Sequence, residues 1–494
     1  MFWSNFLHIY QPINQIPDIL ERIVNESYRP LIKGLKENKK IKLNLNISAC
    51  LTKRLMKDGY QDVVFDLRKL AERGQIEFTD SAAYHAFLPF LPESEIKRQI
   101  KLNQKINKKY FGKVYQPKGF FSPEMAYTKK IGQIVRQMGY QWIILDEIAF
   151  NGKLGEGDWF HFYEIKEAPG LKVFFKNRRI SNLIVNAISR SVSSLKKEIG
   201  PLYKENIYLL TAMDGETFGH HRPGLQKLFF EILSSSSWRK IFISEIPKFI
   251  KYKNKISPLD STWSIEEKDL KERKPFKLWS GNPLQKLQWQ FSYFVIKIIK
   301  ALDHETSDYK KARKKLDAAL ESCQYWWASK YWWSLEIIKQ GAYELKEIIT
   351  DLGNVSQKTR EKAKNFYQKI LTLAFCWQRT GVIRDFHKQK EKWQAIPFRE
   401  RTSPEWFNQI ILEFEAEMRK AAKNQEFEKA IKWRDAIIKL KNGADVYDVL
   451  HVVNELWTVR KLPSLKPFLK HKRFSRFARS YFLPLNYQPK HWKK

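Results

Sequence analysis

Two carboxylates directly follow apolar runs of the sequence, in positions suited to acid–base or nucleophilic chemistry. Glu124 comes after GFFSP, and Asp214 ends the run IYLLTAM just before Gly215. A stiff strand would hold each acid in place, as cleavage of a glycosidic bond requires of its pair. One acid is then ionised and the other protonated, with the carboxyls ~5 to 5.5 Å apart when configuration is retained. The alternative is that either acid caps the following helix.

Further polar side chains follow other short apolar runs. In a parallel barrel the reactive side chains come from the C-terminal ends of the strands and from the loops after them. The sequence therefore predicts that these residues gather at one rim. They are His8 and Gln11 in HIYQP, Glu77 and His85 in GQIEFTDSAAYH, Asp146 after WIIL, and Glu216, His220 and His221 in DGETFGHH. For His8 and His85 the alternative is a core histidine with satisfied hydrogen bonds.

The first 250 residues alternate between short β-branched or aromatic runs and stretches of helical period, which is typical of βα units. Seven or eight such repeats predict an α/β fold with a barrel. We expect strands at Phe6–Tyr10, Ile41–Ile47, Ile76–Thr79, Gly119–Phe121, Trp142–Leu145, Val173–Phe175, Ile207–Met213 and Ile241–Ile243, and helices such as Asp18–Lys36, Val63–Arg73, Glu93–Tyr110, Thr128–Met138 and Leu225–Leu233.

The apolar spacing changes after the expected barrel. Residues 257–283 carry Pro, Ser and Asp without a clear period, and we expect a long loop that reaches over the barrel mouth. From Leu284 on the period is almost purely 3.6, which predicts an all-α region. Its expected helices are Leu284–Leu302, Tyr309–Cys323, Trp332–Asp351, Gln357–Thr380 and a block over Pro404–Asn442.

The chain carries a net charge of +36 over 494 residues. The lysines are spread over nearly every expected helix, so we interpret them as solvated faces and consider nucleic acid an unlikely partner. One exception is Lys461–Lys494, which holds no acidic residue and interleaves aromatic with basic side chains. This tail either touches an anionic partner or pins the C-terminus to the core.

Cysteine usage and hydropathy indicate the compartment. The three cysteines are far apart and odd in number, so we expect no disulfide framework and a reducing environment. No run reaches the ~18 apolar residues of a membrane span, and the N-terminus has no basic region ahead of an apolar core. We therefore predict a cytoplasmic protein with no membrane association.

Four motifs stand in order along the first half of the chain: HIYQP, RGQIEFTDSAAYH, GFFSPEMAYT and TAMDGETFGHHRPG. Together they resemble glycoside hydrolase family 57, which holds amylases, 4-α-glucanotransferases and branching enzymes that act on α-glucans. The resemblance covers roughly residues 1–350. It implies an irregular (β/α)7 TIM-like barrel followed by helices, and a retaining mechanism without metal or other cofactor. It also implies that Glu124 is the nucleophile and Asp214 the general acid/base.

The resemblance also implies which residues line the sugar subsites. One position departs from the family pattern, because Tyr10 stands where the first motif usually has a second histidine. The cluster CQYWWASKYWWSLE lies where the last family motif is expected, and its indole faces suit sugar stacking; filling of the core between helix and barrel is the alternative. We predict substrate contacts from His8, Tyr10, Gln11, Glu77, His85, Asp146, Glu216, His220, His221, Trp326 and Trp327.

The block Glu415–Asn442 resembles a UVR motif, the helical hairpin through which the UvrB and UvrC repair proteins associate. We interpret it as an element that binds a protein partner or another part of its own chain; a plain αα-hairpin is the alternative. The predicted domains are thus a catalytic barrel (1–283), a helical domain that completes the active site (284–400), the UVR-like hairpin (401–445) and a basic extension (446–494).

The sequence therefore predicts an enzyme that hydrolyses or transfers α-1,4-linked glucan through Glu124 and Asp214. The alternative is a glucan-binding or scaffolding protein with weak or no catalysis, acting through the hairpin and the tail. A metal site of the deacetylase kind, built from Asp214, His220 and His221, also remains open. The sequence does not distinguish hydrolysis from transfer or branching.

Overall fold

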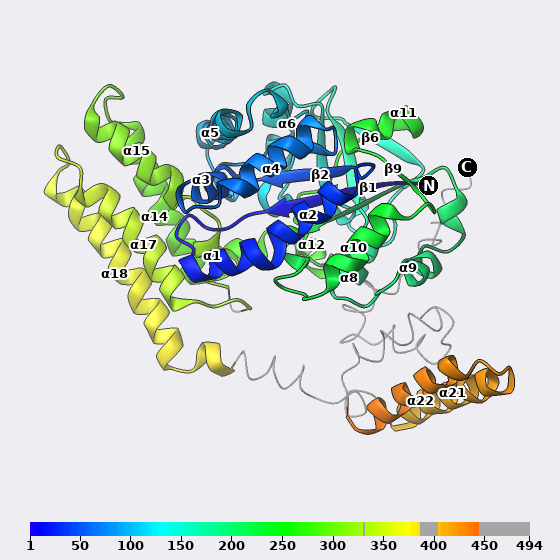
Figure 1. The fold of residues 1–494 in the computed structure, drawn as a ribbon. Helices are drawn as coiled ribbons and strands as arrows, with labels where there is room; N and C mark the ends of the chain where they lie inside the picture. The colour runs from blue at the N-terminus through cyan, green and yellow to red at the C-terminus, as the bar shows by residue number, and fades with distance from the viewer. Residues whose placement is uncertain (330, 386–403, 444–494) are drawn as a thin grey trace.

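The computed structural model describes residues 1–329, 331–385 and 404–443 (Figure 1). Its N-terminal part is a barrel of parallel strands. The strands around the barrel are β1 (Phe2–Ile9), β2 (Leu43–Ile47), β3 (Ile76–Thr79), β4 (Gly119–Phe120), β5 (Trp142–Asp146), β7 (Lys172–Lys176) and β8 (Tyr208–Asp214). One sheet has the order β3-β2-β1-β8 and the other contains β7-β5-β4, with parallel pairing throughout these two runs.

Backbone hydrogen bonds join the two sheets at both seams. After β3, Asp80 N donates to Gly119 O (3.0 Å), and Phe121 N donates to Asp80 O (2.8 Å). After β7, Asn177 N donates to Leu210 O (2.8 Å). In the described part of the chain, seven parallel strands thus follow one another around a ring. This is the predicted (β/α)7 barrel, and its C-terminal strand ends share one rim.

Three further strands lie at the edges of the barrel. β6 (His161–Ile165) pairs antiparallel with β7, β10 (Lys251–Ile256) pairs with β6, and the short β9 (Arg239–Lys240) pairs with the start of β1. The sequence analysis missed β6 and β10 because neither shows an apolar run of the expected kind; β10 alternates lysines on an exposed edge. The expected strand at Ile241–Ile243 is wrong: this segment follows β9 and leads into a 3₁₀ turn, with Ile241 and Ile243 buried in the core.

Amphipathic helices cover the barrel. In α6 (Lys129–Gln137), for example, Ile131, Ile134 and Val135 are buried on one face, and the Thr128 side chain accepts from Ile131 N at the N-terminus. The others are α1 (Pro17–Ile23), joined by a π turn (Val24–Tyr28) to α2 (Arg29–Glu37), α3 (Ala49–Lys57), α4 (Gln61–Glu72), α5 (Glu93–Phe111), α7 (Ile148–Asn151), α8 (Arg178–Val185), α9 (Val192–Ile199), α10 (Leu225–Ser234) and α11 (Ile246–Phe249).

Residues 257–283 are not a structureless loop, because they contain the short helices α12 (Glu267–Lys271) and α13 (Lys277–Ser280). Their first part does reach the rim, as expected. Tyr127 N donates to Ser261 O (2.9 Å), and Trp263 N donates to Glu124 O (3.1 Å). This loop therefore lies against the segment that follows β4.

The rest of the described chain is helical, as predicted, with α14 (Pro283–Lys300), α15 (Ser307–Ala319), α16 (Cys323–Trp326), α17 (Leu335–Thr350) and α18 (Gln357–Arg379) along one side of the barrel (Figure 1). The link between α15 and α16 is attached to the barrel rim, since Ser322 N donates to His85 O (3.2 Å) and Ala86 forms a β-bridge with Glu321. The helices α21 (Pro404–Lys423) and α22 (Phe427–Lys441) form a hairpin. The basic extension predicted at 446–494 lies outside the described residues.

Candidate active site

Glu124 stands in the turn after β4 with a left-handed backbone (φ 63°). This conformation is uncommon outside glycine, and it persists only where surrounding contacts impose it. Those contacts come from Trp263, whose backbone N donates to Glu124 O and whose indole Nε1 donates to Glu124 Oε2 (2.8 Å). The half-buried carboxyl of Glu124 is therefore fixed at the barrel rim.

Asp214 is the last residue of β8 and stands opposite His8 in the β1–β8 register. The next residue, Gly215, packs so closely on β1 that a Cβ there would come within 2.5 Å of Ile9 Cγ2. Gly215 O also accepts from Ser27 Oγ of the π turn (3.0 Å). The close packing explains why a glycine follows the acid, and it holds Asp214 at the same rim.

The two carboxyls influence each other electrostatically. Burial raises the pKa of Glu124 to about 7; the charge of Asp214 adds to this effect, and the Trp263 N–H opposes it. Burial likewise raises the pKa of Asp214 to about 6, while the Lys176 ammonium lowers it. Such shifts are typical of paired acids in an active site. Between about pH 6 and 7 the pair holds one proton.

Lys176 is a basic group that acts on Asp214 and that the sequence did not single out. It ends β7, its Nζ lies 4.9 Å from the ring centroid of Trp263, and it is 3.9 Å from Asp146 Oδ2. Asp146 is fully buried and also binds Arg178 (2.6 Å). Asp146 thus acts on the site through Lys176, and the ammonium at the end of KVFFK was the signal that could have revealed this.

An aromatic stack forms the wall beside the pair. Tyr10 stacks on His85 with 4.2 Å between ring centroids, His85 on His8 with 4.9 Å, and His8 contacts Phe121 at 4.7 Å. Nδ1 of His8 bonds Asn46 Oδ1 (2.8 Å), and Nδ1 of His85 bonds Ser322 Oγ (2.9 Å).

The other ring nitrogen of both histidines is buried without a hydrogen-bond partner in the described part of the chain. These are therefore not core histidines with satisfied hydrogen bonds. Burial lowers the pKa of His8 to about 4 and that of His85 well below its usual value. Both rings are neutral at pH 7, and each keeps a ring nitrogen for a ligand hydroxyl.

Gln11 and Glu216 join the first and fourth motifs. Glu216 Oε1 accepts from Tyr10 N (3.2 Å), from Gln11 Nε2 (3.1 Å) and from the Tyr28 hydroxyl. Burial, together with the charge of Asp214, raises the pKa of Glu216 to about 7. Their contacts fix the backbone around Tyr10 and Asp214.

Three predicted contact residues are not brought to this cluster. In the strand register Glu77 is level with Phe6, two residues before His8 and so nearer the N-terminal side of the barrel. Its oxygens accept hydrogen bonds from Asn44 and Ser244. His220 turns to Glu26 of the π turn (Nδ1–Oε2, 2.6 Å), and His221 is exposed.

The side chains of the tryptophan cluster pack on one another, but they stay partly accessible to solvent. Trp326 and Trp327 are half-buried. The ring centroid of Trp326 lies 5.1 Å from that of Trp279, and the rings of Trp326 and Trp327 both contact Trp332. The deacetylase-like metal site is not formed either. Within residues 1–329, 331–385 and 404–443, no three His, Cys, Asp or Glu side chains are grouped to hold a metal ion.

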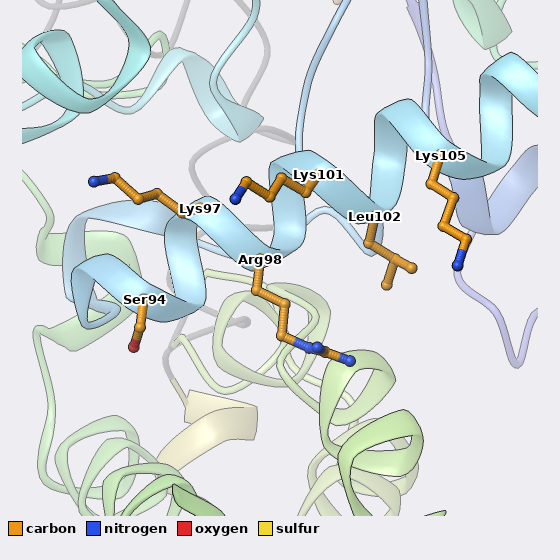
Figure 2. A pocket seen from close by; sticks show the side chains of 6 residues that line it. All are labelled: Ser94, Lys97, Arg98, Lys101, Leu102 and Lys105. Carbon is orange, nitrogen blue, oxygen red and sulfur yellow. The ribbon is translucent and has the colours of Figure 1, made fainter. Parts of the chain in front are cut away.

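A cavity of about 360 Å³ lies elsewhere, on the outer face of α5 (Figure 2). It is lined by Ser94, Lys97, Arg98, Lys101, Leu102 and Lys105. Arg98 there binds Asp317 of α15 (2.6 Å), so part of the charge is neutralised within the fold. The cavity shares no residue with the cluster around Glu124 and Asp214.

The chain belongs to glycosyl hydrolase family 57, whose family model matches residues 4–257, just over half of its length. A second model, the UvrB/uvrC motif, matches residues 408–443. α-Amylase 1 of Dictyoglomus thermophilum is 28% identical over 249 residues, which is 50% of this chain and 35% of that relative. The matched part therefore spans about a third of the relative's length.

Solved structures show the same fold. The 4-α-glucanotransferase of Thermococcus litoralis aligns with a TM-score of 0.59 and 20% identity, covering 71% of this chain and 58% of that one. A branching enzyme of family 57 from Thermococcus kodakaraensis aligns with a TM-score of 0.59 and 14% identity, covering 74% and 94%. In the described residues, no helix is long and apolar enough to cross a membrane.

Replacing Trp263 by Phe tests the electrostatics of the site. The ring and its packing are largely kept, but Glu124 Oε2 loses the N–H that stabilises its ionised form. The pKa of Glu124 should therefore rise above about 7. Carbon-13 NMR titration of labelled glutamate side chains measures this, with Glu124→Gln to assign the resonance and Trp332→Phe as a control. An unchanged titration in Trp263→Phe would contradict the assignment.

Proposed function

We propose that this protein is a retaining glycoside hydrolase or glycosyl-transferring enzyme that acts on α-1,4-linked glucans. The observation that carries the proposal is the placement of Glu124 and Asp214 at the same barrel rim, where burial raises the pKa of both toward neutrality. Family membership supports the chemistry, and the names of the relatives, α-amylase and 4-α-glucanotransferase, support the substrate.

In the proposed reaction Glu124 attacks the anomeric carbon while Asp214 donates its proton to the leaving oxygen. The glycosidic bond breaks, and an ester forms between the sugar and Glu124. Lys176 stabilises the ionised Asp214 that results. Asp214 then takes a proton from water, which gives hydrolysis, or from a sugar hydroxyl, which gives transfer, and the attacking oxygen displaces Glu124.

Burial raises the pKa of both acids toward neutrality, so near neutral pH one can hold a proton while the other is ionised. The productive form has the proton on Asp214 and an ionised Glu124. Positive charge that develops at the anomeric carbon favours an ionised Glu124, so the productive arrangement is stabilised in the transition state.

The proposed sugar contacts are His8, Tyr10 and His85, whose rings form the wall beside the pair, with Trp326 and Trp327 farther along the helical side. Gln11, Asp146 and Glu216 serve this site by positioning Tyr10, Lys176 and Asp214. We keep the cytoplasmic location as part of the proposal; the three cysteines of the chain are free thiols, which supports a reducing compartment.

Removing either acid should abolish most of the activity. Glu124→Gln and Asp214→Asn should each lower kcat on maltoheptaose by roughly a hundredfold to ten-thousandfold. The first variant loses the nucleophile, and the second loses the proton donor. Glu305→Gln, which changes an exposed acid, is the control. Chromatography of the products shows shorter sugars alone for hydrolysis and longer ones as well for transfer. Full activity in both acid variants would refute the assignment, and maltoheptaose binding without turnover by the parent would favour the scaffolding alternative.

The pH dependence follows from the raised pKa values of the two acids. kcat/KM should rise as the pH increases through about 6 and fall as it increases through about 7, because the pair first has no ionised nucleophile and later no proton donor. Lys176→Met removes the charge that lowers the pKa of Asp214, so the curve should move to higher pH. Lys172→Met serves as the control. A flat profile from pH 5 to 9, or a move to lower pH, would contradict this account.

We also propose that the hairpin α21–α22 is a protein-interaction element that pairs with the hairpin of a second copy. The rings of Phe414 and Trp433 pack together between its helices, with 4.9 Å between the ring centroids. Its outer face is apolar: Phe427, Ile431 and Ile438 of α22 and Leu412 of α21 are exposed. A twofold pairing of two copies would bury these apolar side chains of both hairpins.

Light scattering of the full chain tests the pairing. The parent should be a dimer at micromolar concentration, and the triple variant Phe427→Ser, Ile431→Ser, Ile438→Ser should be a monomer with unchanged activity on maltoheptaose. A variant with three changes on exposed α18, Lys358→Ser, Lys362→Ser and Lys369→Ser, controls for surface substitution. A monomeric parent would rule out pairing with a second copy.

A further inference from the structure

Two polar side chains without a role in the proposed mechanism, Glu321 and Cys323, meet Tyr10 beside His85. The Tyr10 hydroxyl donates to Glu321 Oε2 (3.4 Å) and lies 3.3 Å from Cys323 Sγ. In one consistent arrangement, the Cys323 S–H donates to the Tyr10 oxygen and the Tyr10 O–H donates to Glu321. Sequence analysis gave no role to Glu321 or Cys323.

The segment that carries Glu321 and Cys323 is fixed to the rim by several bonds. Ala86 bridges to Glu321, Ser322 N donates to His85 O, and Ser322 Oγ bonds His85 Nδ1 (2.9 Å). Both the backbone and a side chain thus hold this link between α15 and α16 against the barrel. The position of Glu321 is therefore determined by the same histidine that belongs to the aromatic wall.

This group borders the catalytic pair. The charge of Glu124 is close enough to contribute to the raised pKa of the Cys323 thiol. Tyr10 stacks on His85, His85 stacks on His8, and His8 stands opposite Asp214 in the strand register. A sugar unit held between the two acids would therefore meet this wall.

One carboxyl oxygen of the half-buried Glu321 has no hydrogen-bond partner among the described residues. The side chains of Tyr10, Glu321 and Cys323 are half-buried, whereas the neighbouring His85 and Glu216 are buried. Within the described part of the chain, Oε2 of Glu321 has the Tyr10 hydroxyl as its partner, and Oε1 has none. Glu321 Oε1 is not among the fully buried polar atoms, so a ligand hydroxyl can reach it and form the hydrogen bond that the protein leaves open.

The surroundings keep this carboxyl neutral. Burial raises the pKa of Glu321 to about 8; the Glu344 carboxyl of α17 adds to the effect, and the Tyr10 O–H opposes it. The thiols of Cys50 and Cys323 also face this group. At neutral pH Glu321 therefore carries a proton that it can donate, and it adds no negative charge next to Glu124.

We propose that Glu321 binds the substrate and determines specificity: its free carboxyl oxygen hydrogen-bonds a hydroxyl of the sugar unit held against Glu124, while Tyr10 and Cys323 fix its orientation. This inference rests on the proposed function. It assigns the helical region a direct part in recognising a neutral, hydroxyl-rich ligand, beyond covering the barrel.

Two variants separate the hydrogen bond from the volume of the side chain. Glu321→Gln keeps a donor in the same shape and should change kcat/KM on maltoheptaose by less than about threefold. Glu321→Leu fills the space without a donor and should lower kcat/KM by roughly tenfold or more. The control is Glu336→Leu, an exposed acid of α17 that pairs with Lys339, and it should stay within about twofold. Equal kcat/KM in the parent and Glu321→Leu would overturn the inference and leave the proposed function standing.

Calorimetric binding of maltoheptaose decides the case if the parent shows no turnover. A tenfold weaker Kd for Glu321→Leu than for the parent supports the contact, and equal affinity or no binding to either overturns it.

A purely structural role is distinguished by pH. In the Glu124→Gln background the affinity for maltoheptaose should fall above about pH 8, where Glu321 loses its proton, and Glu321→Gln in that background should remove this fall. The same fall in both proteins would also overturn the inference.

Discussion

The site depends on the burial of two acids, Glu124 and Asp214, at the same rim of the barrel. Glu124 and Asp214 are both desolvated at the rim, and the resulting rise in pKa places their titration near neutrality. Several neighbours moderate this cost. The Trp263 N–H stabilises one carboxylate, Lys176 the other, and Asp146 with Arg178 supports Lys176. Charges thus alternate from Arg178 through Asp146 and Lys176 to Asp214, which keeps a buried ionic group nearly balanced.

The site is assembled from segments far apart in the chain, and this makes the loop and the helical region part of it. Glu124 takes its unusual backbone conformation because Trp263, from the segment before α12, bonds it twice. His85 keeps its ring orientation because Ser322, between α15 and α16, bonds it twice. The strands provide the positions of the acids, and the later segments provide their orientation and their environment.

Sequence reasoning succeeded where the local pattern decides the outcome. The ends of β4 and β8, and with them the places of Glu124 and Asp214, follow from short apolar runs and the glycine or proline beside them. It failed where long-range contacts decide. Trp263, Lys176 and Glu321 make their contacts with partners that no local pattern predicts. Glu77 lies on the expected strand, but two residues before the level of His8. His220, which follows the turn at Gly219 (φ 116°), bonds Glu26.

The electrostatics of the site also argue against an anionic ligand, although the chain has a net charge of +36. His8 and His85 are neutral at pH 7, Tyr10 and Glu321 keep their protons, and Lys176 is already paired with Asp146. A phosphate-bearing ligand would meet the negative charge of the acid pair without a free cation in this cluster to offset it. A neutral ligand with many hydroxyls meets ring nitrogens and protonated oxygens instead. The basic residues lie elsewhere, as on the outer face of α5, so the surface charge and the chemistry of the site are separate properties of this chain.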